Sequence, residues 1–192
     1  MSSPKILAFA GSTRKNSYNR KLVELAVAGA RAAGATVTVV ELADYPLPLM
    51  DEDLQESSGI PANAKKLKQL FLENDGLLIA APEYNSSITP LLKNVIDWVS
   101  RSEPGESSLA AYANKTAALC SASPSGWGGL RGLVHVRSIL GNIGVVVLPD
   151  QVCISRAFEA FNPDGLLKEA KQQASIEKLG ATLSGVVGKL RG

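Results

Sequence analysis

The sequence of 192 residues predicts an α/β fold, a doubly wound parallel sheet of five strands with helices on both faces. Segments typical of strands and segments with helical periodicity alternate five times along the chain. Some strand segments are apolar throughout, as strands are when helices cover both faces of a parallel sheet. Three polar loops also follow three of the strands, and in such a fold these loops meet at one edge, where ligands bind.

The first unit is a strand, a polar loop and a helix. Lys5–Ala10 is an apolar run with the length of a buried strand. A helix is expected after the loop, because small and apolar residues recur at three- and four-residue spacing, and Gly34 suits its C-terminal stop. The residues of this apolar face are Leu22, Leu25, Ala26, Gly29 and Ala33.

A long connection separates the next strand from the next helix. Thr36–Leu42 is rich in β-branched residues, which predicts a strand. Residues 44–62 carry three prolines and an acidic run, which indicates an irregular segment, and loops of this length are often functional. A helix is expected over Asn63–Glu73, and its inward-facing residues are Leu67, Leu70 and Phe71.

The centre of the chain holds a buried strand and a clearly marked helix. Gly76–Ala81 is apolar throughout and predicts a central strand. Thr89 followed by Pro90 is typical of a helix start, and this helix is expected to end near Ser100. Trp98 widens its apolar face, which indicates a contact between subunits; a wider groove in the core is the alternative.

The second half of the chain continues the alternation and ends in a helix. Residues 152–161 predict no single structure. The expected elements are a linker over 103–114, a strand over Lys115–Ser121, a helix ending near Leu140, a strand over Gly144–Leu148 and a helix over Leu166–Leu190.

Composition favours one globular domain over residues 1–192, which can bury about 70% of its unfolded surface. Twenty Lys and Arg against eighteen Asp and Glu leave a net charge of +2, too small to argue for nucleic acid. No segment has the roughly 20 apolar residues of a membrane span, and the first residues do not form a signal sequence. We expect Cys120 and Cys153 to be reduced core thiols of a cytoplasmic protein, and His135 to be structural or superficial.

The loop from Gly11 to Asn19 has the residues of an anion site. The first amides of a helix lack partners within it and lie at its positive end, so they can bind a phosphate. The ordinary alternative is that Asn16 or Ser17 only caps the helix and Gly11 only makes a turn. The loop is neither G-x-G-x-x-G nor a Walker motif, which favours a mononucleotide phosphate. The side chains that add donors are Ser12, Thr13, Arg14, Ser17 and Asn19.

Two further loops predict the rest of the ligand. Residues 81–88 are polar and place Tyr84 at the sheet edge, where an aromatic beside backbone amides suits a planar ring. A core tyrosine is the alternative for this residue. Residues 121–129 contain small residues that let the backbone approach a flat ligand. A phosphate at one loop and a planar heteroaromatic ring between the other two describe FMN.

Three segments of the chain resemble the NADPH-dependent FMN reductase family, a flavodoxin-like group that includes bacterial quinone, chromate and azo-dye reductases. They are Gly11-Ser-x-Arg-x-x-Ser-x-Asn19, Pro82-Glu-Tyr-Asn85 and Leu92-Lys-Asn-Val-Ile-Asp-Trp98, and the likeness covers about residues 5–150. The resemblance implies a homodimer or homotetramer with FMN near a subunit interface. This sequence departs from the family pattern at Trp127 and at Thr89-Pro90, on the substrate side of the site.

The resemblance also implies which residues hold the cofactor. The first loop would bind the phosphate, and the second and third loops would border the isoalloxazine ring. The expected cofactor-binding residues are Ser12, Arg14, Ser17, Tyr18, Asn19, Pro82, Glu83, Tyr84, Asn85, Ser121, Ser123 and Gly126.

The expected activity is a ping-pong transfer of hydride from NADPH or NADH, through FMN, to a quinone, free flavin or similar acceptor. FMN is expected to carry the chemistry, so no protein nucleophile or acid/base pair is required, which fits the absence of a Ser-His-Asp or metal-ligand pattern. Glu83 is therefore interpreted as structural or as a subunit contact. Arg101 or Arg131 could receive a 2′-phosphate or form salt bridges. The alternatives are a flavodoxin-type electron carrier, a flavin-binding sensor and a non-flavin nucleotide-binding protein.

Overall fold

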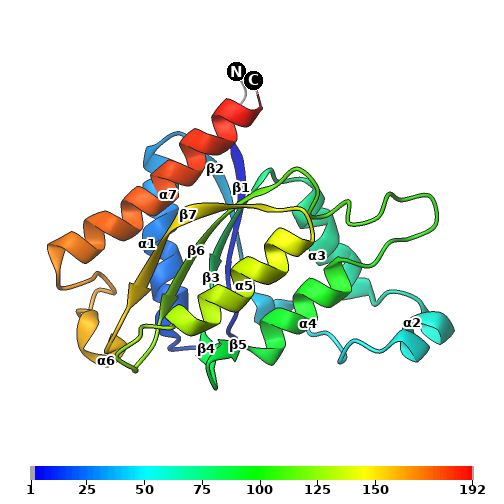
Figure 1. Ribbon diagram of the computed structural model, residues 1–192, viewed down its shortest axis with the longest axis horizontal. Helices are drawn as coiled ribbons and strands as arrows, with labels where there is room; N and C mark the ends of the chain where they lie inside the picture. The colour runs from blue at the N-terminus through cyan, green and yellow to red at the C-terminus, as the bar shows by residue number, and fades with distance from the viewer. Residues whose placement is uncertain (1–2, 192) are drawn as a thin grey trace.

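The computed structural model describes residues 3–191, and its five parallel strands form one sheet in the order β2-β1-β3-β6-β7. The predicted fold class is confirmed, with helices on both faces of the sheet (Figure 1). The strands are β1 (Lys5–Ala10), β2 (Thr36–Val40), β3 (Gly76–Ala80), β6 (Thr116–Ala122) and β7 (Val146–Ile154).

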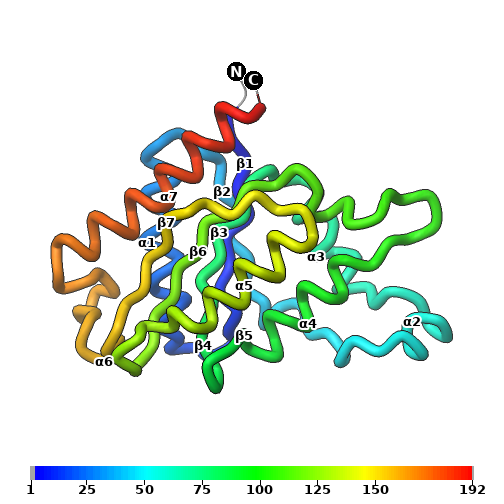
Figure 2. Tube along the Cα trace, viewed as in Figure 1, coloured from blue at the N-terminus to red at the C-terminus, as the bar shows by residue number. Residues whose placement is uncertain are grey.

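Two layers of helices enclose the sheet, and the path of the chain between them can be followed in Figure 2. One face is covered by α1 (Tyr18–Ala32) and α7 (Ala170–Leu190). The other is covered by α3 (Ala62–Leu72), α4 (Pro90–Val99) and α5 (Leu130–Asn142). The short elements are the 3-10 helix η1 (Leu42–Asp44), α2 (Glu52–Ser58), the hairpin strands β4 (Glu83–Tyr84) and β5 (Ser87–Ile88), and α6 (Ala157–Ala160).

Alternation along β1 divides the interior into two cores. Ile6 and Ala8 pack toward α1 and α7, whereas Leu7 and Phe9 pack toward the helices of the other face. The strand order reverses between β1 and β3, and Gly11 N there donates to Ala80 O at 2.9 Å. This is the switch point at which parallel α/β sheets bind ligands, so the topology itself marks one edge of the molecule.

Two glycines bring α1 and α7 into backbone contact. A Cβ atom at Gly29 would lie 1.9 Å from the Glu177 carbonyl oxygen, and one at Gly180 would lie 1.9 Å from that of Ala26. Any side chain at either position would therefore separate the helices. Ala33 lies exposed at the end of α1 and not on its buried face, where it was expected.

The connection over residues 44–62 is more ordered than the sequence predicts, because it contains α2. The Asp51 carboxylate caps this helix by accepting from the backbone N of Asp53 at 2.8 Å. None of the α2 residues is buried, so the helix has no apolar periodicity that would reveal it. Trp98 lies under this connection, fully buried, and its Nε1 donates to Pro48 O at 2.8 Å. The prediction that Trp98 forms a subunit contact is therefore wrong, and the alternative of a wider core groove is confirmed.

The last strand and the last helix differ from their expected bounds. β7 extends to Ile154, beyond the predicted end at Leu148, because its register against β6 shifts between Ala117 and Leu119 and the strand resumes after Pro149. The final helix begins at Ala170 and not at Leu166.

The two ends of the described chain meet at the edge of the sheet opposite the switch point (Figure 1). Arg191 pairs with the Asp75 carboxylate at 2.9 Å and donates to Ser3 O at 3.3 Å. Within residues 3–191, no helix has both the length and the apolar character needed to cross a membrane.

Candidate functional site

The three predicted loops meet in one depression at the carboxyl ends of β1, β3 and β6. The first loop contributes five residues to it, the β4 region three, and the end of β6 with the loop that follows it three. The lining residues are Ser12, Arg14, Ser17, Tyr18, Asn19, Pro82, Glu83, Tyr84, Ala122, Ser123 and Pro124. Nine of the twelve residues predicted to bind the cofactor are therefore brought together.

Asn19 holds the first loop against the end of β6. Its Nδ2 donates to Ala122 O at 2.8 Å, and Ala122 N donates back to its Oδ1 at 3.0 Å. The side chain is buried, and both of its polar ends join the first turn of α1 to the end of β6, 103 residues away. Ala122 itself was missed by sequence reasoning, because it contributes through its backbone.

Thr89 makes a second connection to the first loop. Its hydroxyl oxygen accepts from Leu92 N at 3.2 Å, which caps α4, and it donates to Gly11 O at 3.0 Å. A Cβ atom at Gly11 would lie 3.0 Å from the Leu92 Cβ and 3.2 Å from the Pro82 Cδ. Glycine at this position thus allows the loops after β1 and β3 to pack closely.

The start of α1 has the features of an anion site. Ser17 is its N-cap, yet its side chain makes no capping bond, and the first turn contains no acidic residue. Arg14 is exposed, and its guanidinium enters none of the salt bridges formed within residues 3–191. A buried N-cap hydroxyl, unpaired helix amides and an uncommitted guanidinium are the donors that a phosphate group requires.

The loop after β3 is a β-hairpin that raises Tyr84 at the rim of the depression. Tyr84 pairs with Ser87, and the two turn residues between them, Asn85 and Ser86, have φ of 50° and 66°. This is a two-residue hairpin turn of the type that favours Asn. The side chain of Tyr84 is 54% exposed, which contradicts the alternative of a core tyrosine. Asn85 shapes the turn and does not line the depression.

Glu83 fixes this hairpin to the start of α5. Arg131 Nε donates to its Oε1 at 3.0 Å, and Gly132 N donates to its Oε2 at 3.1 Å. Burial alone would raise the pKa of this carboxyl group, but the hydrogen bonds from Arg131 and Gly132 outweigh it and hold the pKa below its usual value. An ionised and doubly bonded carboxylate is suited to positioning, not to donating a proton.

The loop after β6 contributes Ser123 and Pro124, while two of its predicted residues lie elsewhere. Ser121 is fully buried, and its hydroxyl donates to Ala81 O at 2.7 Å, so it ties β6 to the end of β3. Gly126 has open space around it and does not line the depression. Pro124 was missed, although its place beside Ser123 was a usable signal.

The remaining polar candidates are engaged within the fold. Arg101 pairs with Glu52 at 3.6 Å. Arg131 pairs with Glu83, so both arginines form salt bridges. His135 Nδ1 lies 2.7 Å from Ser87 Oγ.

The two cysteines are free, and burial raises the pKa of the Cys153 thiol to about 11, so this group stays protonated near neutral pH. Among residues 3–191, no three His, Cys, Asp or Glu side chains are grouped so that they could hold a metal.

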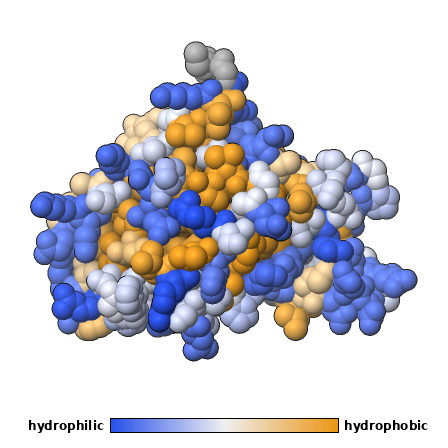
Figure 3. All heavy atoms as spheres, viewed as in Figure 1, coloured by the Kyte–Doolittle hydropathy of each residue, from blue (hydrophilic) through white to orange (hydrophobic). Residues whose placement is uncertain are grey.

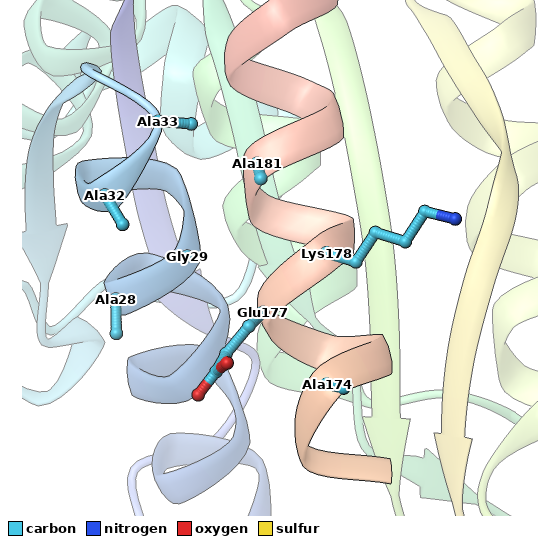
Figure 4. Close-up of a pocket in the computed structure, with 8 residues that line it drawn as sticks. All are labelled: Ala28, Gly29, Ala32, Ala33, Ala174, Glu177, Lys178 and Ala181. Carbon is cyan, nitrogen blue, oxygen red and sulfur yellow. The ribbon is translucent and has the colours of Figure 1, made fainter. Parts of the chain in front are cut away.

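A larger groove of about 560 Å³ lies between α1 and α7, away from the three loops (Figure 4). Its walls are mostly alanine, and Figure 4 shows Lys178 extending away from α1 while Glu177 points toward it. Because no polar groups converge there, the groove is a consequence of the close approach of two alanine-rich helices. Nine of the residues predicted to bind the cofactor line the smaller depression instead.

Comparison with known proteins shows the family of the chain. The family model described as NADPH-dependent FMN reductase matches residues 4–159. An NAD(P)H-dependent FMN reductase of Pseudomonas aeruginosa is 35% identical over 190 residues, which cover 98% of this chain and 97% of that protein. An NAD(P)H:quinone oxidoreductase of Solanum tuberosum is 32% identical over 193 residues, which cover 98% of this chain and 95% of that protein.

Solved structures share the fold. The flavoenzyme FerB of Paracoccus denitrificans, an NAD(P)H:(acceptor) oxidoreductase, superposes with a TM-score of 0.78 at 24% identity. The match covers 97% of this chain and 98% of that one. At 24% identity this match shows only that the two proteins share a fold.

Replacing Glu83 by Gln tests its role in positioning the hairpin. At pH 7 we expect the variant to lose about 1–2 kcal/mol of unfolding free energy, because a charge-assisted bond becomes a neutral one. The folded-state pKa is lowered, so the stabilisation is present above the unfolded value near 4.5 and is lost as the pH falls through the folded value. Urea unfolding at pH 7 and pH 3.5 measures this difference. Glu24→Gln, at an exposed position of α1, is the control; an equal loss at both pH values would contradict the prediction.

Proposed function

The chain belongs to the NADPH-dependent FMN reductase family, and we propose that it is an FMN-dependent NAD(P)H oxidoreductase that passes hydride to a quinone, free flavin or similar acceptor. The observation that carries the proposal is the meeting of three loops in one depression with an anion site at one end and an exposed aromatic at the other. The relatives named as FMN and quinone reductases support the same conclusion.

Each part of the depression has a role in the proposal. Ser12, Arg14 and Ser17, with the first amides of α1, hold the phosphate of FMN. Pro82, Tyr84 and Ser123 border its ring. Asn19 and Glu83 position these loops through their bonds to Ala122 and to α5.

When bound, FMN supplies the two-electron chemistry, and the net reaction is NAD(P)H, a proton and a quinone giving NAD(P)⁺ and a hydroquinone. The protein binds and orients the reactants at the exposed rim, and we assign no proton transfer to a side chain. Arg101 and Arg131 are both engaged in salt bridges, so neither is assigned to a 2′-phosphate, and the proposal covers NADH and NADPH alike.

The competing function is an electron carrier that binds FMN without turnover. Such carriers are usually strongly acidic so that they can dock basic partners, whereas this chain has a net charge of +2. We further propose that residues 1–192 act as one FMN-binding domain in the cytoplasm, a compartment in which two free thiols are ordinary.

We also propose that the enzyme is a homodimer or homotetramer joined through the face of α4 and α5. Figure 3 shows hydrophobic side chains gathered across the middle of the face to which α5 belongs. Val134 on α5 is 56% exposed, and a groove of about 380 Å³ lies between the two helices. Residues that line this groove include Lys93, Ile96, Asp97, Ser138, Ile139 and Ile143.

Anaerobic reduction tests the oxidoreductase activity. The purified protein, reconstituted with FMN, should lose its yellow absorbance when NADPH is added and regain it when a quinone follows. The visible absorbance of the flavin, recorded in a stopped-flow instrument, follows both phases. Binding of FMN without bleaching by NADPH or NADH would favour the carrier instead.

Removing the Arg14 guanidinium tests the phosphate site. Arg14→Ala should weaken FMN binding by about 10- to 100-fold, the effect of losing one or two charge-assisted bonds, and leave the fold intact. Fluorescence titration of the apoprotein with FMN measures the dissociation constant. Lys21→Ala removes a charge from the same helix, but the Lys21 ammonium lies over the Phe161 ring at 5.8 Å, so affinity should hardly change. Equal effects of the two variants would mean that Arg14 acts only through net charge.

A charge on the proposed interface tests the assembly. Val134→Asp should shift the protein toward a monomer at micromolar concentration, because an aspartate would be desolvated in the contact. Sedimentation velocity gives the distribution of species. Leu49→Asp is the matched control at an exposed position of the 44–62 connection, and an unchanged distribution for Val134→Asp would move the interface elsewhere.

A further inference from the structure

Trp127 is a tryptophan that the fold leaves in solvent. Its side chain is 60% exposed in the loop between β6 and α5, whereas Trp98 is fully buried. Tryptophan is highly buried on average, because its large ring loses much by contact with water. Trp127 also stands where the sequence departs from its family pattern, and the proposed cofactor site does not use it.

The backbone around Trp127 is closely packed. The next two residues, Gly128 and Gly129, have φ of 60° and 90°. A Cβ atom at Gly128 would lie 2.9 Å from Ser155 N, and one at Gly129 would lie 1.9 Å from Ser121 Oγ. Leu130 N also donates to Trp127 O at 3.0 Å. The indole is therefore attached to a turn that packing holds in place, so little backbone entropy is lost when it binds a ligand.

The same loop borders the cofactor depression. Ser123 and Pro124, at its start, line the depression, and a Cβ atom at Gly129 would lie 3.8 Å from the Cβ of Glu83, beside Tyr84. Two exposed aromatic rings thus stand on neighbouring loops at one edge of the sheet. Tyr84 lines the depression and Trp127 does not. Because Trp127 is exposed, its ring is available to a second molecule that approaches from outside.

We propose that Trp127 is a specificity-determining residue that stacks on the flat ring of a planar acceptor such as a naphthoquinone. The inference rests on the proposed function, because it assigns a role toward the acceptor of that reaction. Offset stacking of two rings contributes a modest but selective free energy, and it is not available to an acceptor that has no flat face. Trp127 would therefore favour planar acceptors over compact inorganic ones.

Fluorescence tests the contact without turnover. In the oxidised protein with FMN and without NAD(P)H, 1,4-naphthoquinone should quench tryptophan emission with a saturable midpoint. Trp127→Phe should abolish this quenching and leave the emission of buried Trp98. Phe158→Ala is the matched control, because it removes an aromatic ring of similar exposure, 57%, that lies on α6 and not in the loop between β6 and α5. The quinone should quench the emission of this variant as it does that of the wild type. Undiminished quenching in Trp127→Phe would overturn the proposal.

Steady-state kinetics tests the selectivity. Trp127→Ala should raise KM for 1,4-naphthoquinone by about threefold to tenfold, the factor expected for a lost aromatic pair. In Trp127→Phe, which keeps an aromatic ring, KM should stay close to the wild-type value. KM for ferricyanide, an octahedral ion, should stay the same in both variants. An equal rise for the two acceptors would overturn the proposal.

Two further outcomes are distinguishable. If Trp127→Ala changes the sedimentation of the protein and leaves both KM values unchanged, the indole is covered by a second copy of the chain, and the proposal is overturned. If NADPH does not reduce the wild-type flavin, the proposed function fails. The role of Trp127 toward an acceptor then fails with it, because no reaction delivers electrons to an acceptor, even if the quinone quenches Trp127.

Discussion

The paired hydrogen bonds between Asn19 and Ala122 hold the binding edge together, because they join the first turn of α1 to the end of a strand 103 residues later. Both groups are buried, so neither can exchange its partner for water at low cost. Thr89 adds a second connection, from α4 to Gly11. The helix amides at the start of α1 are thereby fixed in direction before any ligand arrives, which is the preorganisation that an anion site requires.

Much of this edge could be predicted from the sequence, since its causes are local. The apolar runs of β1 and β3 mark buried parallel strands, and Thr89 with Pro90 marks the start of α4. Parallel topology then requires the loops that follow the strands to meet. The convergence of distant loops is thus a consequence of strand direction, not of any single motif.

The errors arose where a residue's partner is distant in sequence. Ser121 has the composition of a binding residue, but its hydroxyl is taken by Ala81 across the sheet. Trp98 has the appearance of a surface aromatic, yet the 44–62 connection folds over it. The helix α2 has no buried face and thus no periodicity to detect. For Ser121 and Trp98 the deciding contact is tertiary, and local patterns carry no information about it.

The bond from Arg191 to Ser3 joins the two ends of the described chain at the edge of the sheet farthest from the three loops. A fluorophore, surface tether or fusion partner attached at this corner would point away from the cofactor edge. The same proximity makes the protein suitable for circular permutation, since a short bridge could join residues 3 and 191 there while new ends are opened in an exposed loop.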